Sequence, residues 1–568
     1  MSDLIERASA WLADDPDPST RADTAAMIAG ADEATLEEHF GDRLQFGTAG
    51  LRGELGAGPN RMNRALVRRV SAGLADYVRS TGGTSAVVGY DGRHGSLSFA
   101  QDTARVLAGR GLKVWLYDRV APTPELAWAV TRLAVDVGVM VTASHNPPQD
   151  NGYKVYWSNG AQIIAPHDTG ISAAIDRIAD LSGVDTPDLD HLLDEARVSL
   201  VPAKVRADYL LAVAELRVHP DTKAHVVYTA MHGVGADLIR AVFAGTAHTL
   251  ELVPAQAEPD PDFPTVAFPN PEEPGATDLA LAQAKLSGAQ VILANDPDAD
   301  RLAVVARHRG DWVSLTGNQI GALLADDLLR YGPPRPHPLV ATTIVSSQLL
   351  SRIAASHGAS YAETLTGFKW IANRAITHDA AGGTFIFGYE EAIGFSAGPV
   401  VRDKDGVSAA VLFADLVGHC ARGSETVVDR LDALYAEHGC YGSSQKALTL
   451  PGAEGRATIE RTMATLRAAP PTSIGGSEVI RLVDVQLGIS TDTTTGTSEP
   501  LDLPRSNVLA FTLADGGRVL ARPSGTEPKI KFYFEARVDV DGDIADARAR
   551  AKVRLAELTA DLSATLGL

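Results

Sequence analysis

Short apolar runs alternate with helix-like segments along most of the chain. Runs at 85–90, 113–117 and 137–142 predict strands, and the segments at 97–108 and 124–133 predict helices between them. This strand–helix–strand rhythm is typical of an α/β sheet. The rhythm returns twice, with strands at 225–231, 290–295 and 339–344 and helices at 235–243, 278–286, 406–421 and 426–438.

The pattern changes near residue 442. From there, strands surround a helix expected at 455–468, and a charged helix begins at 545, which predicts an α+β unit unlike the preceding ones. One earlier segment, 257–274, is rich in Pro and acidic residues and is either disordered or a packed loop. Its Phe263 and Phe268 favour a packed loop beside an active cleft.

Ser144 stands directly after one of the apolar runs, in Val-Thr-Ala-Ser-His-Asn-Pro-Pro at 141–148. The two prolines exclude a continuing helix, so Ser144 is expected on a rigid loop at the end of a strand. Ligands of open α/β sheets collect at that edge. The segment therefore predicts a nucleophilic serine, with an ordinary polar turn as the alternative.

Three aspartates, Asp296, Asp298 and Asp300, follow the apolar run at 291–294. Carboxylates at alternate positions repel one another unless a cation neutralises them, and oxygen-only ligands favour Mg²⁺, Mn²⁺ or Ca²⁺ over zinc. The alternative is a solvated acidic turn. An EF-hand is excluded, because Arg301 and Arg307 occupy the positions where its Gly and Glu should be.

A third polar segment, Arg-Pro-Ser-Gly-Thr-Glu-Pro-Lys-Ile-Lys at 522–531, combines hydroxyls, a glycine and cations. These are the groups of a phosphate-binding loop. The spacing of a Walker loop is missing. A polar hairpin turn is the alternative.

Composition narrows the class of protein. The 568 residues exceed what one hydrophobic core supports, and the formal charge of −20 disfavours nucleic acid or an anionic membrane as partner. Two cysteines, Cys420 and Cys440, indicate a reducing compartment rather than a disulfide scaffold. We find no run long enough to span a bilayer and no secretory pattern at the start, and expect a cytoplasmic protein.

The three polar segments, in this order, resemble the α-D-phosphohexomutase family of phosphoglucomutases and phosphomannomutases. Shorter matches extend the resemblance over almost the whole chain: Phe-Gly-Thr-Ala-Gly-Leu-Arg-Gly at 46–53, Gly-Tyr-Asp-Gly-Arg at 89–93, Pro-Thr-Pro at 122–124, Asn-Gly-Tyr-Lys at 151–154, Thr-Gly-Phe-Lys at 366–369, Gly-Tyr-Glu-Glu-Ala at 388–392 and Arg-Asp-Lys-Asp-Gly at 402–406. The family's fold would be three similar α/β domains with mixed sheets and a C-terminal α+β domain around a central cleft. We expect the boundaries at 1–204 (phosphoserine), 205–312 (metal), 313–441 (sugar) and 442–568 (phosphate).

The resemblance also implies a reaction. A phosphoserine at Ser144 would lend its phosphate to a hexose phosphate and recover it from the other end of the sugar, with Mg²⁺ held by Ser144, Asp296, Asp298 and Asp300 and with glucose 1,6-bisphosphate as activator. His145, Lys154 and Arg52 are the candidates for proton transfer, although His145 equally fits a role in holding Ser144. The remaining implied sugar and phosphate contacts are Arg301, Thr366, Gly367, Glu390, Lys404, Arg522, Ser524, Gly525 and Thr526. Small sugar phosphates are the expected partners of a monomer or homodimer.

One position departs from the family. Many members carry Ser two residues after the sugar-contacting Glu, where this chain has Ala392. The form resembles a branch with phosphopentomutases and enzymes that make sugar bisphosphates, so pentose phosphate remains an alternative to glucose or mannose phosphate. A metal-dependent phosphatase and a catalytically silent sugar-phosphate binder are the alternatives outside the mutases.

Overall fold

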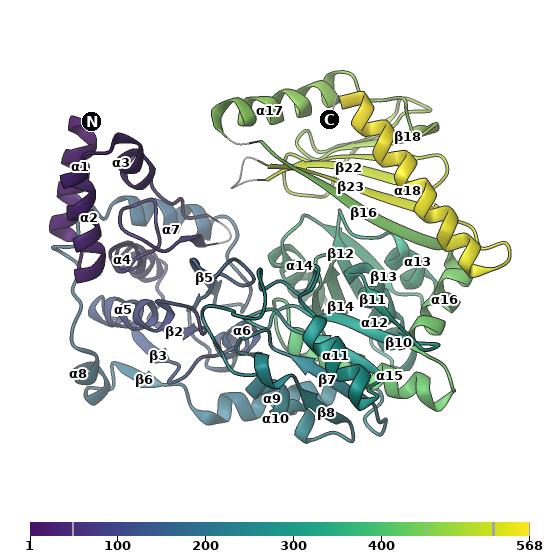
Figure 1. Ribbon diagram of the computed structural model, residues 1–568, viewed down its shortest axis with the longest axis horizontal. Coiled ribbons are helices and arrows are strands. Elements are labelled where there is room, and N and C mark those ends of the chain that lie inside the picture. The colour runs from purple at the N-terminus through teal and green to yellow at the C-terminus, as the bar shows by residue number, and fades with distance from the viewer. Residues whose placement is uncertain (48–49, 451, 525–528, 567–568) are drawn as a thin grey trace.

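Four β-sheets follow one another along the chain (Figure 1). They are seen in a computed structural model that describes residues 1–47, 50–450, 452–524 and 529–566. In Figure 1 the first unit lies on one side, the second and third lie together at the centre, and the fourth stands above the third. None of the described helices combines the length and apolarity needed to cross a bilayer.

The first sheet has the strand order β1-β5-β4-β2-β3-β6. Its parallel part is β2 (Ser85–Tyr90), β3 (Lys113–Leu116), β4 (Val137–Val141) and β6 (Val198–Leu200), and β5 (Asp150–Trp157) and β1 (Leu51–Glu54) continue it antiparallel. All five residues of β4 are buried, as expected for a central strand covered on both faces. The helices of this unit are α1 (Ser2–Asp14), α2 (Pro18–Gly30), α3 (Glu33–Phe40), α4 (Arg64–Ser80), α5 (Ser96–Gly109), α6 (Thr123–Arg132), α7 (His167–Asp176) and α8 (Leu189–Asp194).

The second and third sheets repeat this plan. In the second, β7 (His225–Thr229), β8 (Thr249–Leu252) and β9 (Val291–Ala294) are parallel, and β10 (Ala303–His308) and β11 (Asp311–Leu315) are antiparallel. In the third, β12 (Pro338–Thr343), β13 (Ser360–Thr364) and β14 (Thr384–Glu390) are parallel and β15 (Gly394–Ala397) is antiparallel. The accompanying helices are α9 (Ala203–Leu216), α10 (Gly235–Ala244), the short 3₁₀ helix η1 (Pro254–Gln256), α11 (Asp278–Ser287), α12 (Gly317–Tyr331), α13 (Leu349–Ser356), α14 (Phe368–Ala380), α15 (Gly406–Arg422) and α16 (Val427–His438).

Each of these three units therefore has a central parallel strand that ends in a loop and is followed by an antiparallel neighbour. The three loops join β4 to β5, β9 to β10 and β14 to β15. Each contains a non-glycine residue in the left-handed region, with φ of 55° at Ser144, 57° at Ala299 and 53° at Ile393. Such a conformation costs about 1–3 kcal/mol and is concentrated at functional sites.

The fourth sheet is antiparallel, in the order β16-β23-β22-β21-β18-β19-β20, with β17 paired to β18. One face packs on α17 (Gly452–Ala468) and α18 (Ile544–Leu566), and the other packs on the third unit. The alternation of side chains explains both contacts, because Phe511 faces the helices while Ala510 faces the third unit. The strands are β16 (Cys440–Thr449), β17 (Ser473–Ile474), β18 (Ser477–Asp484), β19 (Ile489–Asp492), β20 (Ser498–Pro500), β21 (Leu509–Leu513), β22 (Arg518–Pro523) and β23 (Lys529–Val538).

The predicted rhythm of elements and the α/β class followed by an α+β unit are confirmed, with local differences. The strand expected at 225–231 ends at Thr229, because Met231 and His232 have φ of 49° and 61° and turn the chain away. Two expected domain boundaries, after 312 and after 441, fall inside β11 and β16. β11 pairs with β10 of the second sheet, and β16 pairs along its whole length with β23 of the fourth.

The segment at 257–274 is a packed loop rather than a disordered one. The side chain of Phe263 is buried, and the guanidinium of Arg93 lies 5.0 Å from the centre of its ring. The loop thus covers the first unit at the segment that follows β2, where Gly92, Arg93 and His94 lie.

Candidate active site

Ser144 lies where the sequence predicts it, on the loop between β4 and β5. Its hydroxyl donates to Asp296 Oδ2 at 2.8 Å and lies 3.3 Å from His145 Nδ1. Its backbone N–H donates to Thr142 Oγ1 at 2.9 Å, which supports the left-handed conformation. The Ser144 hydroxyl is therefore aimed at the aspartates of the second unit.

Arg93 fixes the shape of the Ser144 loop. Its guanidinium donates to the carbonyl oxygens of Ser144 and Pro147, both at 2.7 Å, and also to those of Asn146 and Asp150. Asp91, whose carboxylate lies 3.4 Å away, balances its charge. Arg52 approaches the same loop from β1 and donates to the side chain of Asn146 at 3.1 Å.

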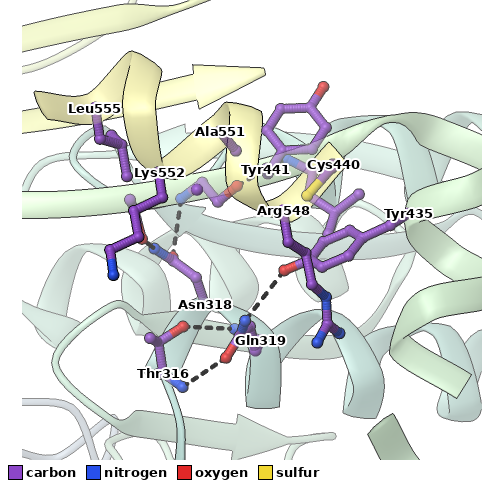
Figure 2. Close-up of a pocket in the computed structure, with 14 residues that line it drawn as sticks. Thr316, Asn318, Gln319, Tyr435, Cys440, Tyr441, Arg548, Ala551, Lys552 and Leu555 are labelled. Atoms are coloured by element: carbon purple, nitrogen blue, oxygen red, sulfur yellow. Dashed lines mark hydrogen bonds between the residues drawn. The ribbon is translucent and has the colours of Figure 1, made fainter. Parts of the chain in front are cut away.

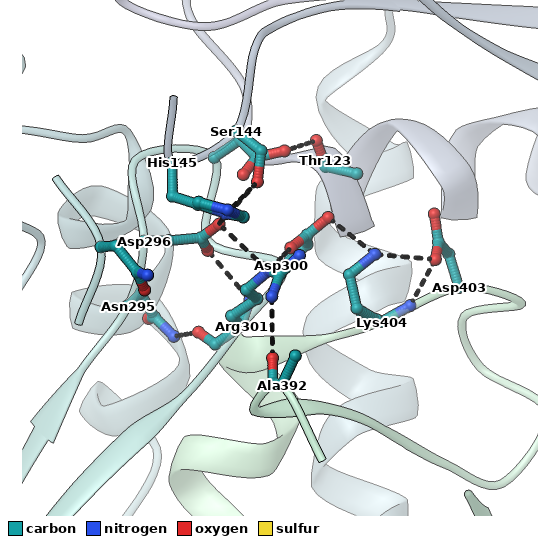
Figure 3. A network of polar contacts seen from close by, with 12 residues as sticks. Thr123, Ser144, His145, Asn295, Asp296, Asp300, Arg301, Ala392, Asp403 and Lys404 are labelled. Atoms are coloured by element: carbon teal, nitrogen blue, oxygen red, sulfur yellow. Dashed lines mark hydrogen bonds and ion pairs between the residues drawn. The ribbon is translucent and has the colours of Figure 1, made fainter. Parts of the chain in front are cut away.

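The loop after β9 carries the three aspartates, which are fully buried. Figure 3 shows two of them, Asp296 and Asp300. Their carboxylates offer ligand atoms that lie within 4.8 Å of one another. The loop is held by backbone bonds from other segments, because Thr123 N–H donates to the carbonyl of Asp298 and Val234 N–H donates to that of Pro297. The turn that contains His232 and Val234 therefore supports the aspartate loop.

Cations from all three of the first units surround the aspartates. The ammonium of Lys154, on β5, lies 2.7 Å from Asp298 and 3.0 Å from Asp300, and Lys404 lies 3.0 Å from Asp300. Arg301 lies 3.8 Å from both Asp296 and Asp300 and donates to the carbonyl of Ala392. Figure 3 shows Ser144 of the β4 loop, Arg301 of the β9 loop, Ala392 of the β14 loop and Lys404 of the segment before α15 converging on the aspartates.

This arrangement separates the pKa values of the carboxyl groups. Burial and then the neighbouring Asp298 and Asp300 raise the pKa of Asp296 well above its ordinary value. Burial acts in the same direction on Asp298, but Lys154 and Thr123 outweigh it and lower the pKa of Asp298. Burial, followed by Arg301 and Arg52, lowers the pKa of His145 well below its usual value, so its imidazole is neutral at pH 7.

The aspartates fit a divalent metal ion. Asp298 Oδ1 and Asp300 Oδ1 are buried and have no hydrogen-bond partner within the described ranges, which is costly for a carboxylate oxygen unless a cation binds it. Carboxylates with a serine oxygen form a hard, oxygen-only set suited to Mg²⁺. The predicted ligands Ser144, Asp296, Asp298 and Asp300 are thus brought together.

The predicted sugar-binding residues form a second group, on the third unit. Glu390, the last residue of β14, accepts a hydrogen bond from Gly367 N–H at 2.8 Å. The hydroxyl of Thr366 is buried and has no partner in the described part of the chain. Lys404 connects the two groups, because its stem lies against Gly394, where a Cβ would come within 2.3 Å of Lys404 Cδ.

The predicted phosphate residues belong to the fourth unit. Arg522 is in β22 and lies half-buried beside Tyr533, and the Ser524 N–H donates to the carbonyl of Lys529 at 2.7 Å. The predicted Gly525 and Thr526 lie outside the described residues. Arg522 forms no ion pair with a carboxylate among the described residues, unlike Lys154 and Lys404.

A separate cavity of about 270 Å³ lies between the third and fourth units (Figure 2). Residues of α18, including Arg548 and Lys552, face Asn318 and Gln319 at the start of α12. It shares no lining residue with the serine–aspartate group.

Comparisons with known proteins agree with this geometry. The phosphoglucomutase/phosphomannomutase α/β/α domains I, II and III match residues 43–182, 207–310 and 316–438, and the C-terminal domain of the same family matches 497–550. The chain belongs to the phosphoglucomutase/phosphomannomutase family. It is therefore a phosphomutase, an isomerase acting on sugar phosphates.

Among its relatives, a Haemophilus influenzae protein named as a probable phosphomannomutase is 42% identical, over 84% of this chain and 93% of its own. The phosphopentomutase of Mus musculus is 37% identical, over 94% of this chain and 90% of its own. In fold, the chain resembles the open form of parafusin, a phosphoglucomutase from Paramecium, with a TM-score of 0.66 at 18% identity over 91% of this chain and 96% of that one. The relatives thus differ in their sugar.

Three contacts of this phosphomutase site were missed by sequence reasoning. Thr123 donates to Asp298 at 2.6 Å, Arg93 holds the serine loop, and Asp403 joins Lys404 to Tyr156 and Gln162 of the first unit. Thr123, Arg93 and Asp403 all occur in the short matching motifs, which was the signal available. Their roles depend on which strand ends meet in space.

Proposed function

We propose that this phosphomutase moves phosphate between C1 and C6 of a hexose phosphate, of glucose or mannose, through a phosphoserine at Ser144 and a bisphosphorylated sugar. The observation that carries this proposal is the 2.8 Å contact between Ser144 Oγ and Asp296, within a group of buried aspartates suited to Mg²⁺. A phosphatase using an aspartate nucleophile would leave this contact without a purpose.

Charge supports a phosphate at Ser144. The three aspartates are matched by the three cations Lys154, Lys404 and Arg301. A divalent ion would add two positive charges, and a phosphoserine adds about −1.5 to −2 at pH 7. Ion and phosphate are therefore expected to bind together, because either alone would leave a buried charge unbalanced.

The transfer itself exchanges two oxygen partners of phosphorus. The bond to Ser144 Oγ breaks as a bond to the sugar hydroxyl oxygen forms, and the hydroxyl proton passes to the serine oxygen. His145, 3.3 Å from Ser144 Oγ, is placed to relay that proton, and Lys154 and Arg52 are the other candidates. Mg²⁺ held by Ser144, Asp296, Asp298 and Asp300 would neutralise charge on the phosphoryl oxygens.

The sugar must then turn end for end and present its other phosphate. Glu390 with the Thr366–Gly367 turn is placed to bind sugar hydroxyls, and Arg301 and Lys404 border the transferred phosphate. Arg522, with Ser524, Gly525 and Thr526, would bind the distal phosphate. Glucose 1,6-bisphosphate or its equivalent would phosphorylate Ser144 initially.

A second candidate is a phosphopentomutase, which exchanges phosphate between C1 and C5 of ribose or deoxyribose. Ala392 lacks the hydroxyl that many relatives offer to a hexose, and the mouse phosphopentomutase aligns with 94% of the chain. A related activity, synthesis of a sugar bisphosphate, would use the same serine.

The test is a coupled assay with Mg²⁺, a trace of glucose 1,6-bisphosphate and either glucose 1-phosphate or ribose 1-phosphate. We expect formation of the isomeric phosphate with negligible free phosphate, and loss of activity when the metal is chelated. Ser144→Ala should lower turnover at least about 10³-fold while the circular dichroism spectrum stays unchanged.

Ser158→Ala, at an exposed turn of the same unit, is the matched control and should keep full activity. Turnover by Ser144→Ala at the wild-type rate would refute the phosphoserine. Phosphate release at a rate comparable to isomerisation would indicate a phosphatase, and inertness with every sugar phosphate would indicate a binder.

A further inference from the structure

Lys369 ends the Thr-Gly-Phe-Lys motif, but neither the predicted site residues nor the serine–aspartate chemistry gives it a role. It is the second residue of α14 and is half-buried. Its stem packs over Gly367, where a Cβ would lie 3.4 Å from Lys369 Cε. Its ammonium makes no hydrogen bond or ion pair within the residues that the structure describes.

The charged groups around Lys369 come from three units. Glu390 and Asp403 belong to the third unit, Asp168 to α7 of the first, and Arg522 to β22 of the fourth. Asp168 Oδ1 is itself buried and has no partner among described residues. Lys369 therefore lies where the first, third and fourth units face one another, next to the Glu390–Gly367 pair proposed to bind sugar.

The other cations of the site differ from Lys369 in their contacts. Lys154 and Lys404 are each within 3.0 Å of a carboxylate, so their charge is already matched. Lys369 and Arg522 are not matched by an ion pair inside the described ranges. A half-buried ammonium without a partner loses hydration and gains nothing in return, so an anion that binds it is favoured.

We propose that Lys369 binds, together with Arg522, the phosphate of the sugar that lies away from Ser144. The proposal rests on the proposed function, because only a substrate held by Ser144 at one end requires a cation for the phosphate at its other end. Lys369 is then a substrate-binding residue in both orientations of the sugar.

The surroundings of Lys369 give the proposal a pH signature. Burial, against the opposing effect of Asp168 and Glu390, lowers the pKa of Lys369 to about 8. An anion binds the charged form, so affinity should fall as the pH rises through about 8. An arginine at this position, as in Lys369→Arg, stays charged throughout this range, so the affinity of that variant should not fall as the pH rises.

The experiment measures binding by calorimetry in a Ser144→Ala background, where no transfer occurs. The ligands are glucose 6-phosphate and ribose 5-phosphate, at pH 7 and pH 9. Lys369→Met keeps the unbranched stem that packs on Gly367 and removes only the charge. We expect Lys369→Met to weaken binding about tenfold or more at pH 7. Lys369→Arg should keep its affinity at both pH 7 and pH 9.

Kinetics of the enzyme with native Ser144 provide a second measurement. There, Lys369→Met should raise KM more than it lowers kcat.

Lys285→Met, on the exposed face of α11, removes the same charge from a chain of net charge −20 and is the matched control. Wild-type affinity in Lys369→Met, or an equal loss in Lys285→Met, would overturn the proposal, as would absence of binding by either sugar phosphate. Failure of the proposed function has a different signature, because it would appear as turnover by Ser144→Ala whatever Lys369→Met does.

Discussion

The first three units and the fourth are joined to the active site in different ways. One continuous apolar core runs through the first three units and reaches only one edge of the fourth, at Tyr441, Ala547 and Ala551, whereas most of the fourth unit has a core of its own between its sheet and α17 and α18. Polar contacts also cross-link the first three units at the aspartates, through Ser144, Lys154 and Lys404. The centre that is proposed to carry the phosphoryl group is therefore assembled without any substrate.

The fourth unit is connected more locally. Between described residues, its polar contacts to the rest of the chain go to the third unit, such as Arg518 with Glu363 at 3.0 Å and Gln348 N–H with Glu535. Apolar contacts complete the interface, in a small cluster with Ile344 and Tyr533 and where Tyr441 and Ala551 join the large core. Such an interface can change without disturbing the serine–aspartate centre. We therefore infer that the site has a fixed part, which is Ser144 with the three aspartates and their contacts in the first three units, and a mobile part, which is the fourth unit with Arg522 and can close over the substrate.

Two arginines allow a direct test of this difference, and Arg93 in the fixed part should give the larger effect. Arg93→Met removes the donor to four carbonyls of the Ser144 loop, so the serine should shift relative to Asp296. A displacement of that kind costs about 10²-fold in rate. We expect steady-state kinetics to show a lower kcat with little change in KM.

Arg79→Met, on α4 of the same unit, is the control for the loss of an arginine elsewhere on the fixed part. A large rise in KM with normal kcat in Arg93→Met would contradict a positioning role.

Arg522→Met should affect binding instead of the chemical step. Arg522 belongs to the fourth unit and would bind the distal phosphate, and losing one charge-assisted contact should raise KM about tenfold. Mass spectrometry should still find phosphate on Ser144 after incubation with glucose 1,6-bisphosphate, because the fixed centre is intact. Arg481→Met, at an exposed position of β18 in the same sheet, should behave as wild type. Equal losses of kcat in Arg522→Met and Arg93→Met would remove the distinction between the two parts.

The residues of the fixed part could be predicted from the sequence better than the residues that hold it in position or lie around it. Ser144 and the three aspartates could be found because their residue types carry a specific chemistry and follow apolar runs that end strands. The role of Arg93 could not, because its four acceptors are backbone carbonyls that lie more than 50 positions further along the chain. Lys369 was part of a recognised motif, but its importance comes from burial and from neighbours on three units, which no local pattern contains.

Two of the expected boundaries between units fall inside strands for a related reason. β10 and β11 form a hairpin, so the second sheet continues past 312 without a change in composition that would mark its end. β16 likewise enters the fourth sheet directly after Gly439, whose φ of 96° ends α16. Pairing partners distant in sequence, such as β23 for β16, decide where each unit ends.

Closure of the fourth unit should give a smaller measured effect than either arginine variant, because the change in the radius of gyration comes from the movement of one unit out of four. Small-angle scattering is the measurement, with Mg²⁺ and with or without glucose 1,6-bisphosphate. We expect a smaller radius of gyration with the bisphosphate, since Arg522 must approach a phosphate whose partner lies at Ser144. Arg522→Met should reduce this compaction, because the ligand can shift the equilibrium only through contacts that differ between the open and closed states. Arg93→Met should leave it unchanged, because Arg93 contacts the fixed part alone. Calorimetry under the same conditions must show that the bisphosphate binds. If it binds and the scattering profiles of the wild type with and without it are identical, the fourth unit is as fixed as the other three. Arg93 and Arg522 would then differ only in the atoms they contact.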